Sequence, residues 1–245
     1  MSIERQIAYH DLDTPLQGYL HLPEHHTAPL PGILLIHGAG GLDAHAREQA
    51  GRYADLGYAV LAADLFGPVW GTGRENLVAY LKELRDEPDL LVRRAAAGLS
   101  ALGQCAESAS DGRFAAVGFC FGGMAALTLA RAGLELAAAV SLHGSLATVR
   151  PARPGEVRAR LLVCHGARDP HVPMADVAAF TEEMIAADAD WRLVMYGQAV
   201  HGFTHRHAVP GAPGQIPGVA YDQDADELSF AEAREFLAAS FTRVA

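Results

Sequence analysis

Hydrophobic and polar positions alternate along this chain in two ways. Short apolar runs bounded by polar or glycine-rich segments are typical of buried strands, whereas apolar positions that recur every three or four residues are typical of helices. The first pattern predicts strands at residues 3–9, 16–22, 32–37, 58–63, 114–119, 136–142, 160–166 and 191–196. The second predicts helices at residues 44–56, 75–86, 89–105, 123–130, 174–187 and 226–241.

Most of these strands alternate with helices, which is the pattern of right-handed crossovers and a mostly parallel sheet. The first two strands are joined by a short polar turn and predict an antiparallel hairpin at the sheet edge. We therefore expect an α/β fold of about eight strands flanked by helices, in a single domain spanning residues 1–245. Residues 143–159 leave no room for a large lid domain, and the loops 66–74 and 198–224 are expected to shape a pocket.

The segment Gly118-Phe119-Cys120-Phe121-Gly122 joins one predicted strand to the next helix. It has the pattern G-x-C-x-G, a nucleophile elbow with cysteine in place of serine. The glycines are needed because a side chain at either end of the sharp turn would collide with neighbouring backbone. At the start of a helix, the partial positive charge favours the thiolate of Cys120 over the thiol.

A cysteine nucleophile needs a histidine base and an acid that orients it. Asp169 follows the strand at 160–166, and His201 follows the strand at 191–196. Because functional groups gather at the carboxyl ends of strands in open α/β sheets, we expect both residues to meet Cys120 there. The sequence thus predicts a Cys120–His201–Asp169 triad.

These three motifs and their order resemble those of the dienelactone hydrolases, the cysteine-dependent branch of the α/β-hydrolases. The elbow at 118–123, the acid loop at 165–173 and the histidine loop at 201–204 carry the resemblance, which extends from about Gly18 to Leu237. It implies an α/β-hydrolase fold and a hydrolase of carboxylic esters, lactones or thioesters that acts through an acyl-enzyme. It also implies no cofactor, and an oxyanion hole formed by the backbone N–H groups of Ala39 and Phe121.

One position departs from the family pattern. Members of the family usually carry a carboxylate directly after the strand that ends here at His37, and this carboxylate contacts the resting cysteine. This chain has Gly38 there, in a run similar to the oxyanion loop of esterases and lipases. The family also uses arginines to hold a substrate carboxylate. Arg206 and Arg74 are the candidates, and the alternative is that they are solvated surface residues.

Further residues are expected around the pocket. The predicted substrate-binding residues are His37, Gly38, Trp70, His143 and Arg206. The histidines at strand ends, including His165, are expected to hydrogen-bond to loop backbone and to form the pocket floor. No metal site is expected, because the chain has no H-E-x-x-H pattern or paired carboxylates; the spacing of His205 and His207 from His201 does not change this. Phe66 is expected either to form a pocket wall with Trp70 or to pack the sheet edge.

Composition and charge limit which partners and which cellular compartment we expect. The formal net charge is −10 and the pI about 5.6, so we expect no nucleic-acid partner. The polar N-terminal segment predicts no signal peptide, and the absence of long apolar runs predicts no membrane span. Cys105 and Cys164 are expected in the core. An odd number of scattered cysteines favours a cytoplasmic protein, which we expect to be a monomer or weak homodimer with a small-molecule substrate.

Two other functions are compatible with part of this sequence. Glutamine amidotransferases share G-x-C-x-G, but they follow the cysteine with G-x-Q and end in H-x-E, and this chain has neither. A non-catalytic small-molecule binding protein on the same fold is the stronger alternative, and Gly38 in place of the family carboxylate is the feature that favours it.

Overall fold

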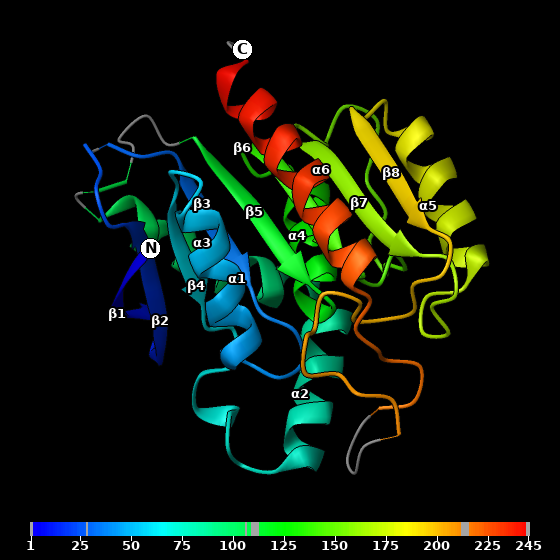
Figure 1. Cartoon of the computed structure of the whole chain (residues 1–245), viewed down its shortest axis with the longest axis horizontal. Coiled ribbons are helices and arrows are strands. Elements are labelled where there is room, and N and C mark those ends of the chain that lie inside the picture. Colours follow the sequence, from blue (N-terminus) through cyan, green and yellow to red (C-terminus); the bar gives the residue numbers. More distant parts are fainter. Residues whose placement is uncertain (1, 28, 106, 109–112, 212–215, 244–245) are drawn as a thin grey trace.

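The computed structural model describes residues 2–27, 29–105, 107–108, 113–211 and 216–243. Eight strands and six α-helices follow one another in this part of the chain (Figure 1). The strands are β1 (Ser2–Asp11), β2 (Thr14–Pro23), β3 (Gly32–Ile36), β4 (Ala59–Ala63), β5 (Phe114–Phe119), β6 (Leu136–Leu142), β7 (Arg160–Gly166) and β8 (Trp191–Tyr196). The helices are α1 (Ala44–Ala54), α2 (Arg74–Asp86), α3 (Pro88–Gly103), α4 (Phe121–Arg131), α5 (Met174–Ala186) and α6 (Gln223–Thr242), and a short 3₁₀ turn covers Gly67–Val69.

The eight strands form one sheet in the order β1-β2-β4-β3-β5-β6-β7-β8. Strands β1 and β2 pair as an antiparallel edge hairpin, and β2 is antiparallel to β4. All other neighbours are parallel. This arrangement confirms the predicted mostly parallel sheet with a hairpin at its edge.

Helices cover both faces of the sheet because successive side chains of a strand point to opposite faces. In β3, Leu34 and Ile36 pack into a core formed with α3, α4 and α5, whereas Ile33 and Leu35 pack into a second core formed with α1 and α6. Figure 1 shows α1 and α6 in front of the strands. Since both faces are buried, the central strands are apolar throughout, as their sequences predicted.

The carboxyl ends of the parallel strands lie at one edge of the sheet. The register aligns them, because Ile36 pairs with Gly118, Phe119 with Leu142, and Leu142 with Cys164. Helix α2 and the loop after β8 lie beyond this edge (Figure 1). Residues 143–159, between β6 and β7, hold neither helix nor strand, so no lid domain is inserted there. No helix of the described chain has the length and apolarity that a membrane crossing requires.

Candidate active site

The turn between β5 and α4 is tightly packed, as its glycines predict. A Cβ atom added at Gly118 would overlap the carbonyl oxygen of Gly122, and one added at Gly122 would overlap the carbonyl oxygen of Ile36. Between these two glycines, Cys120 has φ 54° and ψ −115°, a strained conformation for a residue with a side chain. This backbone conformation directs Sγ outward from the end of the sheet, which is the geometry of a nucleophile elbow.

Three side chains from three different turns meet at this point. Nε2 of His201 lies 3.0 Å from Sγ of Cys120, and Nδ1 of His201 lies 2.8 Å from Oδ2 of Asp169. The other oxygen of Asp169 accepts hydrogen bonds from the backbone N–H groups of His171 at 2.7 Å and Val172 at 3.2 Å. The carboxylate is thus fixed in place, and it orients the imidazole toward the sulfur.

The charges of this trio favour a thiolate and an imidazolium. Burial opposes charge on each group, but the hydrogen bond that His201 donates to Asp169 and the contact with Cys120 raise the pKa of His201 to about 10. Burial likewise opposes the Cys120 thiolate, yet the hydrogen bond and charge of His201 hold the pKa of the thiol below its usual value. The same balance, with hydrogen bonds from His201 and from two backbone N–H groups outweighing burial, lowers the pKa of Asp169.

Two backbone N–H groups lie beside the sulfur. Those of Phe121 and Ala39 hydrogen-bond to it and contribute to the lowered pKa of Cys120. Phe121 begins α4, and Ala39 lies in the turn after β3. These are the two residues expected to form an oxyanion hole, and the structure brings them together at Cys120.

A cavity of about 800 Å³ lies over the trio, with Cys120, His201, Gly38 and Ala39 in its wall. Much of the remaining wall is apolar. It includes Val78, Leu81, Met124, Val172, Ile216 and Val219. Helix α2 and the loop after β8 therefore supply the side of the cavity that faces the sheet edge, consistent with their place in Figure 1.

His143 is the predicted pocket histidine that hydrogen-bonds to the backbone of the nucleophile. It follows β6, lines the cavity, and accepts a hydrogen bond from the backbone N–H of Cys120 at 3.2 Å. Its ring contacts that of His201 edge to face, with centroids 5.5 Å apart. Burial and the charge of His201 hold the pKa of His143 well below its usual value, so this imidazole is neutral.

Two other predicted pocket residues, His37 and Trp70, do not line the cavity. His37 is fully buried, where its Nδ1 donates to the carbonyl of Gly38 at 2.7 Å and its Nε2 accepts from the backbone of Leu65. Trp70 is half exposed and stacks on Phe66, whose ring is buried against the sheet end. Local packing thus uses the rings of both residues, and the expectation that His37 and Trp70 bind substrate stays a prediction that their place outside the cavity wall does not support.

Arg206 also points away from the cavity. Its Nε forms an ion pair of 3.6 Å with the buried carboxylate of Asp226, which accepts a hydrogen bond of 2.7 Å from Arg52. This ion pair connects the loop after β8 to α6. Arg74, the other arginine candidate, is exposed at the start of α2 and outside the cavity wall. Neither arginine is placed to hold a substrate carboxylate.

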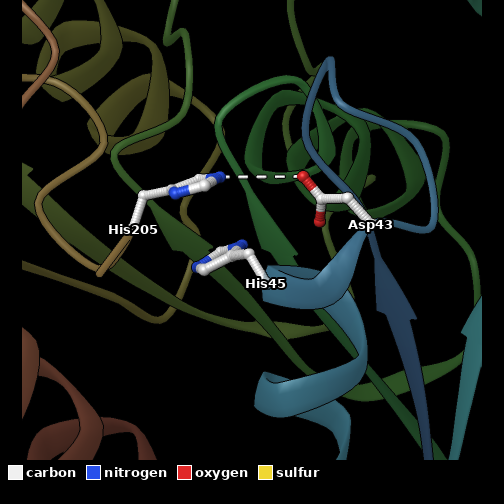
Figure 2. A group of neighbouring side chains, drawn as sticks. All are labelled: Asp43, His45 and His205. Carbon is white, nitrogen blue, oxygen red and sulfur yellow. Dashed lines mark ion pairs between the residues drawn. The ribbon is translucent and has the colours of Figure 1, made fainter. Parts of the chain in front are cut away.

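Asp43, His45 and His205 form a polar group in the cavity wall (Figure 2). One side-chain nitrogen or oxygen from each lies within 4.8 Å of the others. However, the two imidazoles are stacked, with centroids 4.6 Å apart and planes inclined by only 11°. A nitrogen lone pair lies in the plane of its ring, so stacked rings cannot direct two lone pairs at one ion without rotating. The expectation of no metal stays a prediction, and the stacking gives it a physical reason.

The surroundings of Gly38 leave room for a side chain. A Cβ atom there would lie 3.5 Å from Cβ of Cys120, an ordinary contact distance. Nearby carboxylates are engaged elsewhere, since Asp64 accepts hydrogen bonds from the backbone of Phe66 and Gly67, and Asp43 caps α1 through the N–H of Ala46. Neither carboxylate substitutes for the side chain that Gly38 lacks.

The model of the dienelactone hydrolase family matches residues 16–241, nearly the whole chain. The chain belongs to this family. Membership confirms the expected fold and gives a hydrolase as the general class of activity.

Two solved structures are similar to this dienelactone hydrolase family member over almost its full length. One, named m3DLH, is 38% identical with a TM-score of 0.87 and covers 98% of each chain. The other, a dienelactone hydrolase-like promiscuous phosphotriesterase from metagenomic libraries, is 36% identical with a TM-score of 0.87, covering 97% of this chain and 98% of that one. A Yersinia pestis protein named "Putative carboxymethylenebutenolidase" is 27% identical over 206 residues, 77% of this chain and 74% of the relative.

Proposed function

We propose that this protein hydrolyses carboxylic esters, lactones or thioesters by two-step acyl transfer through Cys120. The observation that carries the proposal is the 3.0 Å approach of His201 Nε2 to Cys120 Sγ, with Asp169 behind the imidazole and a cavity in front of the sulfur. A base within hydrogen-bond reach of a nucleophile, itself oriented by a third group, is the arrangement that nucleophilic catalysis needs.

In the first step, Sγ of the Cys120 thiolate attacks the carbonyl carbon and forms a C–S bond. The N–H groups of Phe121 and Ala39 stabilise the oxyanion that results; removal of one such donor typically costs about 10²–10³ in rate. As the intermediate collapses, the C–O or C–S bond to the leaving group breaks, and His201 Nε2–H gives its proton to that group. The acyl chain remains on Cys120 as a thioester.

In the second step, His201 is neutral and takes a proton from water. The resulting hydroxide adds to the thioester carbonyl, and the oxyanion occupies the same two N–H groups. Collapse breaks the C–S bond and releases the carboxylic acid and the Cys120 thiolate. The imidazolium retains the proton from water, which restores the starting ion pair without any cofactor.

The lining of the cavity favours uncharged substrates with an apolar group. Apolar side chains from α2 and the loop after β8 face the sulfur, and the two cationic side chains of the α2 wall, Lys82 and Arg85, both pair with Asp86. The net charge of −10 further disfavours anions. We propose a small neutral ester, lactone or thioester as the partner of this site.

The alternative is a non-catalytic small-molecule binding protein, and one experiment separates it from the hydrolase. The protein is mixed with a panel of activated neutral esters, lactones and thioesters and followed by stopped flow and intact-mass spectrometry. A phosphotriester belongs in the panel because one similar protein is named as a promiscuous phosphotriesterase. We expect a stoichiometric burst and an acyl adduct on Cys120, both absent in Cys120→Ala. Binding of panel compounds without any adduct would favour the alternative.

The compartment and the assembly are also proposals. Cys105, Cys120 and Cys164 are all free thiols. Free thiols persist in reducing compartments, so we propose that the enzyme is cytoplasmic. We also propose a monomer or weak homodimer.

A further inference from the structure

A line of hydrogen bonds leads away from the backbone of Cys120. Its N–H donates to Nδ1 of His143 at 3.2 Å, Nε2 of His143 lies 2.8 Å from Oγ1 of Thr204, and this hydroxyl lies 3.0 Å from Nε2 of His45. The exposed fractions of His143, Thr204 and His45 are 2%, 1% and 5%. We call these three side chains the buried relay. They come from the turn after β6, the loop after β8 and helix α1.

The direction of each hydrogen bond follows from the first. A backbone N–H can only donate, so Nδ1 of His143 accepts. A neutral imidazole whose Nδ1 accepts carries its proton on Nε2, which therefore donates to Thr204. The hydroxyl of Thr204 has one proton and two lone pairs, so it can accept from His143 and donate to Nε2 of His45, and the relay is complete with this direction. His45 must carry its own proton on Nδ1, on the side of the ring that Figure 2 shows toward Asp43.

Both imidazoles of the buried relay are neutral, as this directionality requires. Burial and the charge of His201 hold the pKa of His143 well below its usual value. Burial and the charge of His205 lower the pKa of His45 to about 4. A protonated His143 would present a donor to the N–H of Cys120, and it would place a second positive charge beside His201.

The first hydrogen bond of the buried relay acts on a strained peptide. The N–H of Cys120 is shared between the carbonyl of Leu142, at 3.0 Å, and Nδ1 of His143. His143 itself has φ 42° and donates its backbone N–H to the carbonyl of Cys164 at 2.8 Å. Strained conformations such as those of Cys120 and His143 persist only where the surroundings hold them. The Cys120 backbone also sets the directions of Sγ and of the Phe121 N–H.

We propose that Thr204 and His45 are positioning residues that fix the tautomer of His143, so that its imidazole holds the Cys120 peptide in the orientation needed for acylation. His45 accepts the Thr204 proton, which leaves Thr204 able only to accept from His143. With the opposite tautomer, two donors would face each other at Cys120. The inference rests on the proposed hydrolase function and assigns a role in it to residues that do not touch the substrate carbonyl.

The wild-type protein allows a direct test. Long-range ¹H–¹⁵N NMR of protein labelled with ¹⁵N-histidine reports which ring nitrogen carries a proton, and resonances are assigned by single histidine substitutions. We expect His143 to be protonated on Nε2 alone and His45 on Nδ1 alone. A His143 that is protonated on Nδ1, or on both nitrogens near neutral pH, would overturn the proposal.

Substitutions then connect the tautomer to the reaction. Thr204→Val removes the hydroxyl at nearly constant volume. It should lower kcat and the acylation burst rate about tenfold, the effect of one hydrogen bond, with KM little changed. Thr204→Ser should restore both the rate and the His143 tautomer. Thr128→Val is the matched control, because it removes another buried threonine hydroxyl, one that bonds within α4, and should leave kcat unchanged.

His45→Phe gives a second, independent variant. It keeps an aromatic ring against Phe119, which the His45 ring now contacts with centroids 5.0 Å apart. Without an acceptor at position 45, Thr204 can donate to His143 and select the wrong tautomer. We expect slow acylation together with a proton on Nδ1 of His143.

Outcomes for the buried relay and for the proposed function are separable. If the wild type shows an acyl burst and Thr204→Val acylates at the same rate, the buried relay is wrong and the hydrolase stands. If the wild type shows no burst with any ester, lactone or thioester, the proposed function fails, and the tautomer of His143 alone decides whether the buried relay exists.

Discussion

At the scale of single residues, Gly38 decides the resting state of Cys120. The resemblance to dienelactone hydrolases implies that a carboxylate at this position engages the idle cysteine. Here, within the described chain, the groups that stabilise the thiolate are His201 and the backbone N–H groups of Phe121 and Ala39. Because no carboxylate of the described residues hydrogen-bonds to the sulfur, the thiolate should persist between turnovers.

Substituting Gly38 tests this resting state. Gly38→Glu should raise the pKa of Cys120 and slow its alkylation at neutral pH, because a carboxylate near the sulfur disfavours the thiolate. Gly38→Gln, of the same shape without the charge, should keep the native profile. The measurement is the rate of iodoacetamide reaction against pH. In the native protein we expect the rate to rise at a pH below the usual thiol pKa of about 8.5. A native titration at or above that value would contradict this account.

The three thiols should differ strongly in reactivity. Cys120 has a lowered pKa and lies in the cavity wall, whereas burial raises the pKa of Cys105 and raises that of Cys164 to about 12. Alkylation follows the thiolate fraction and access. Peptide mapping after brief iodoacetamide treatment should therefore show modification of Cys120 well before the other two. Equal labelling of all three thiols would count against an activated Cys120.

Sequence reasoning predicted the triad residues but not all of their neighbours. Cys120, Asp169 and His201 are recognisable because each lies in a local motif at a strand end. The contact between His45 and Thr204 joins residues 159 positions apart, and although Thr204 lies in the histidine loop at 201–204, no local pattern links it to His45. Conversely, Arg206 fits a family spacing approximately, yet it pairs with the buried carboxylate of Asp226 in α6, outside the motif.

At the scale of elements, the nucleophile elbow depends on backbone packing. Gly122→Ala should destabilise the protein severely, because its Cβ would overlap the carbonyl oxygen of Ile36 in β3. Gly197→Ala is the matched control, since its Cβ would meet nothing within 4 Å. We expect thermal denaturation to show a large drop in Tm, or no folded protein, for Gly122→Ala, and a change within about 0.5 kcal/mol for the control. Similar stability of the two variants would mean that the turn adapts.

Most element boundaries were predicted to within a few residues, and the differences have local causes. Helix α6 was expected from residue 226 but begins at Gln223, because Asp222 caps it through the N–H of Ala225. The hairpin strands extend further than expected, to Asp11 and from Thr14, because Leu12 adopts φ 53° and allows a tight turn. The apolar pattern marks what is buried, whereas caps and turns determine where elements end.

At the scale of the whole molecule, the negative net charge and the apolar cavity lining both disfavour anionic substrates. Of two otherwise matched esters, the neutral one should have a kcat/KM at least about tenfold higher than one carrying a carboxylate, because among the described residues that line the cavity the arginine, Arg85, is already paired with Asp86. Arg206→Ala should leave this ratio unchanged, since its guanidinium faces Asp226. A preference for the anionic ester that Arg206→Ala abolishes would show instead that Arg206 moves to bind substrate.

The sequence predicted a parallel sheet but not the order of its strands. Apolar runs show that the strands are buried, yet they do not specify which run lies beside which. The order places β3 between β4 and β5, so the turns carrying Ala39 and Cys120 become neighbours. The proximity of these two segments is a property of the assembled sheet.

This distribution of the active site along the chain has a consequence for folding. The trio is complete only when β8, the last strand, has paired with β7 and brought His201 to Cys120. Long-range pairings form late because loop closure opposes them. Trp191 begins β8 and pairs with Leu161 of β7, so in a Trp70→Phe variant, which removes the other tryptophan, its fluorescence reports on that pairing. During refolding from denaturant, the acyl burst should appear together with the Trp191 signal, which makes catalytic competence a marker of the completed fold.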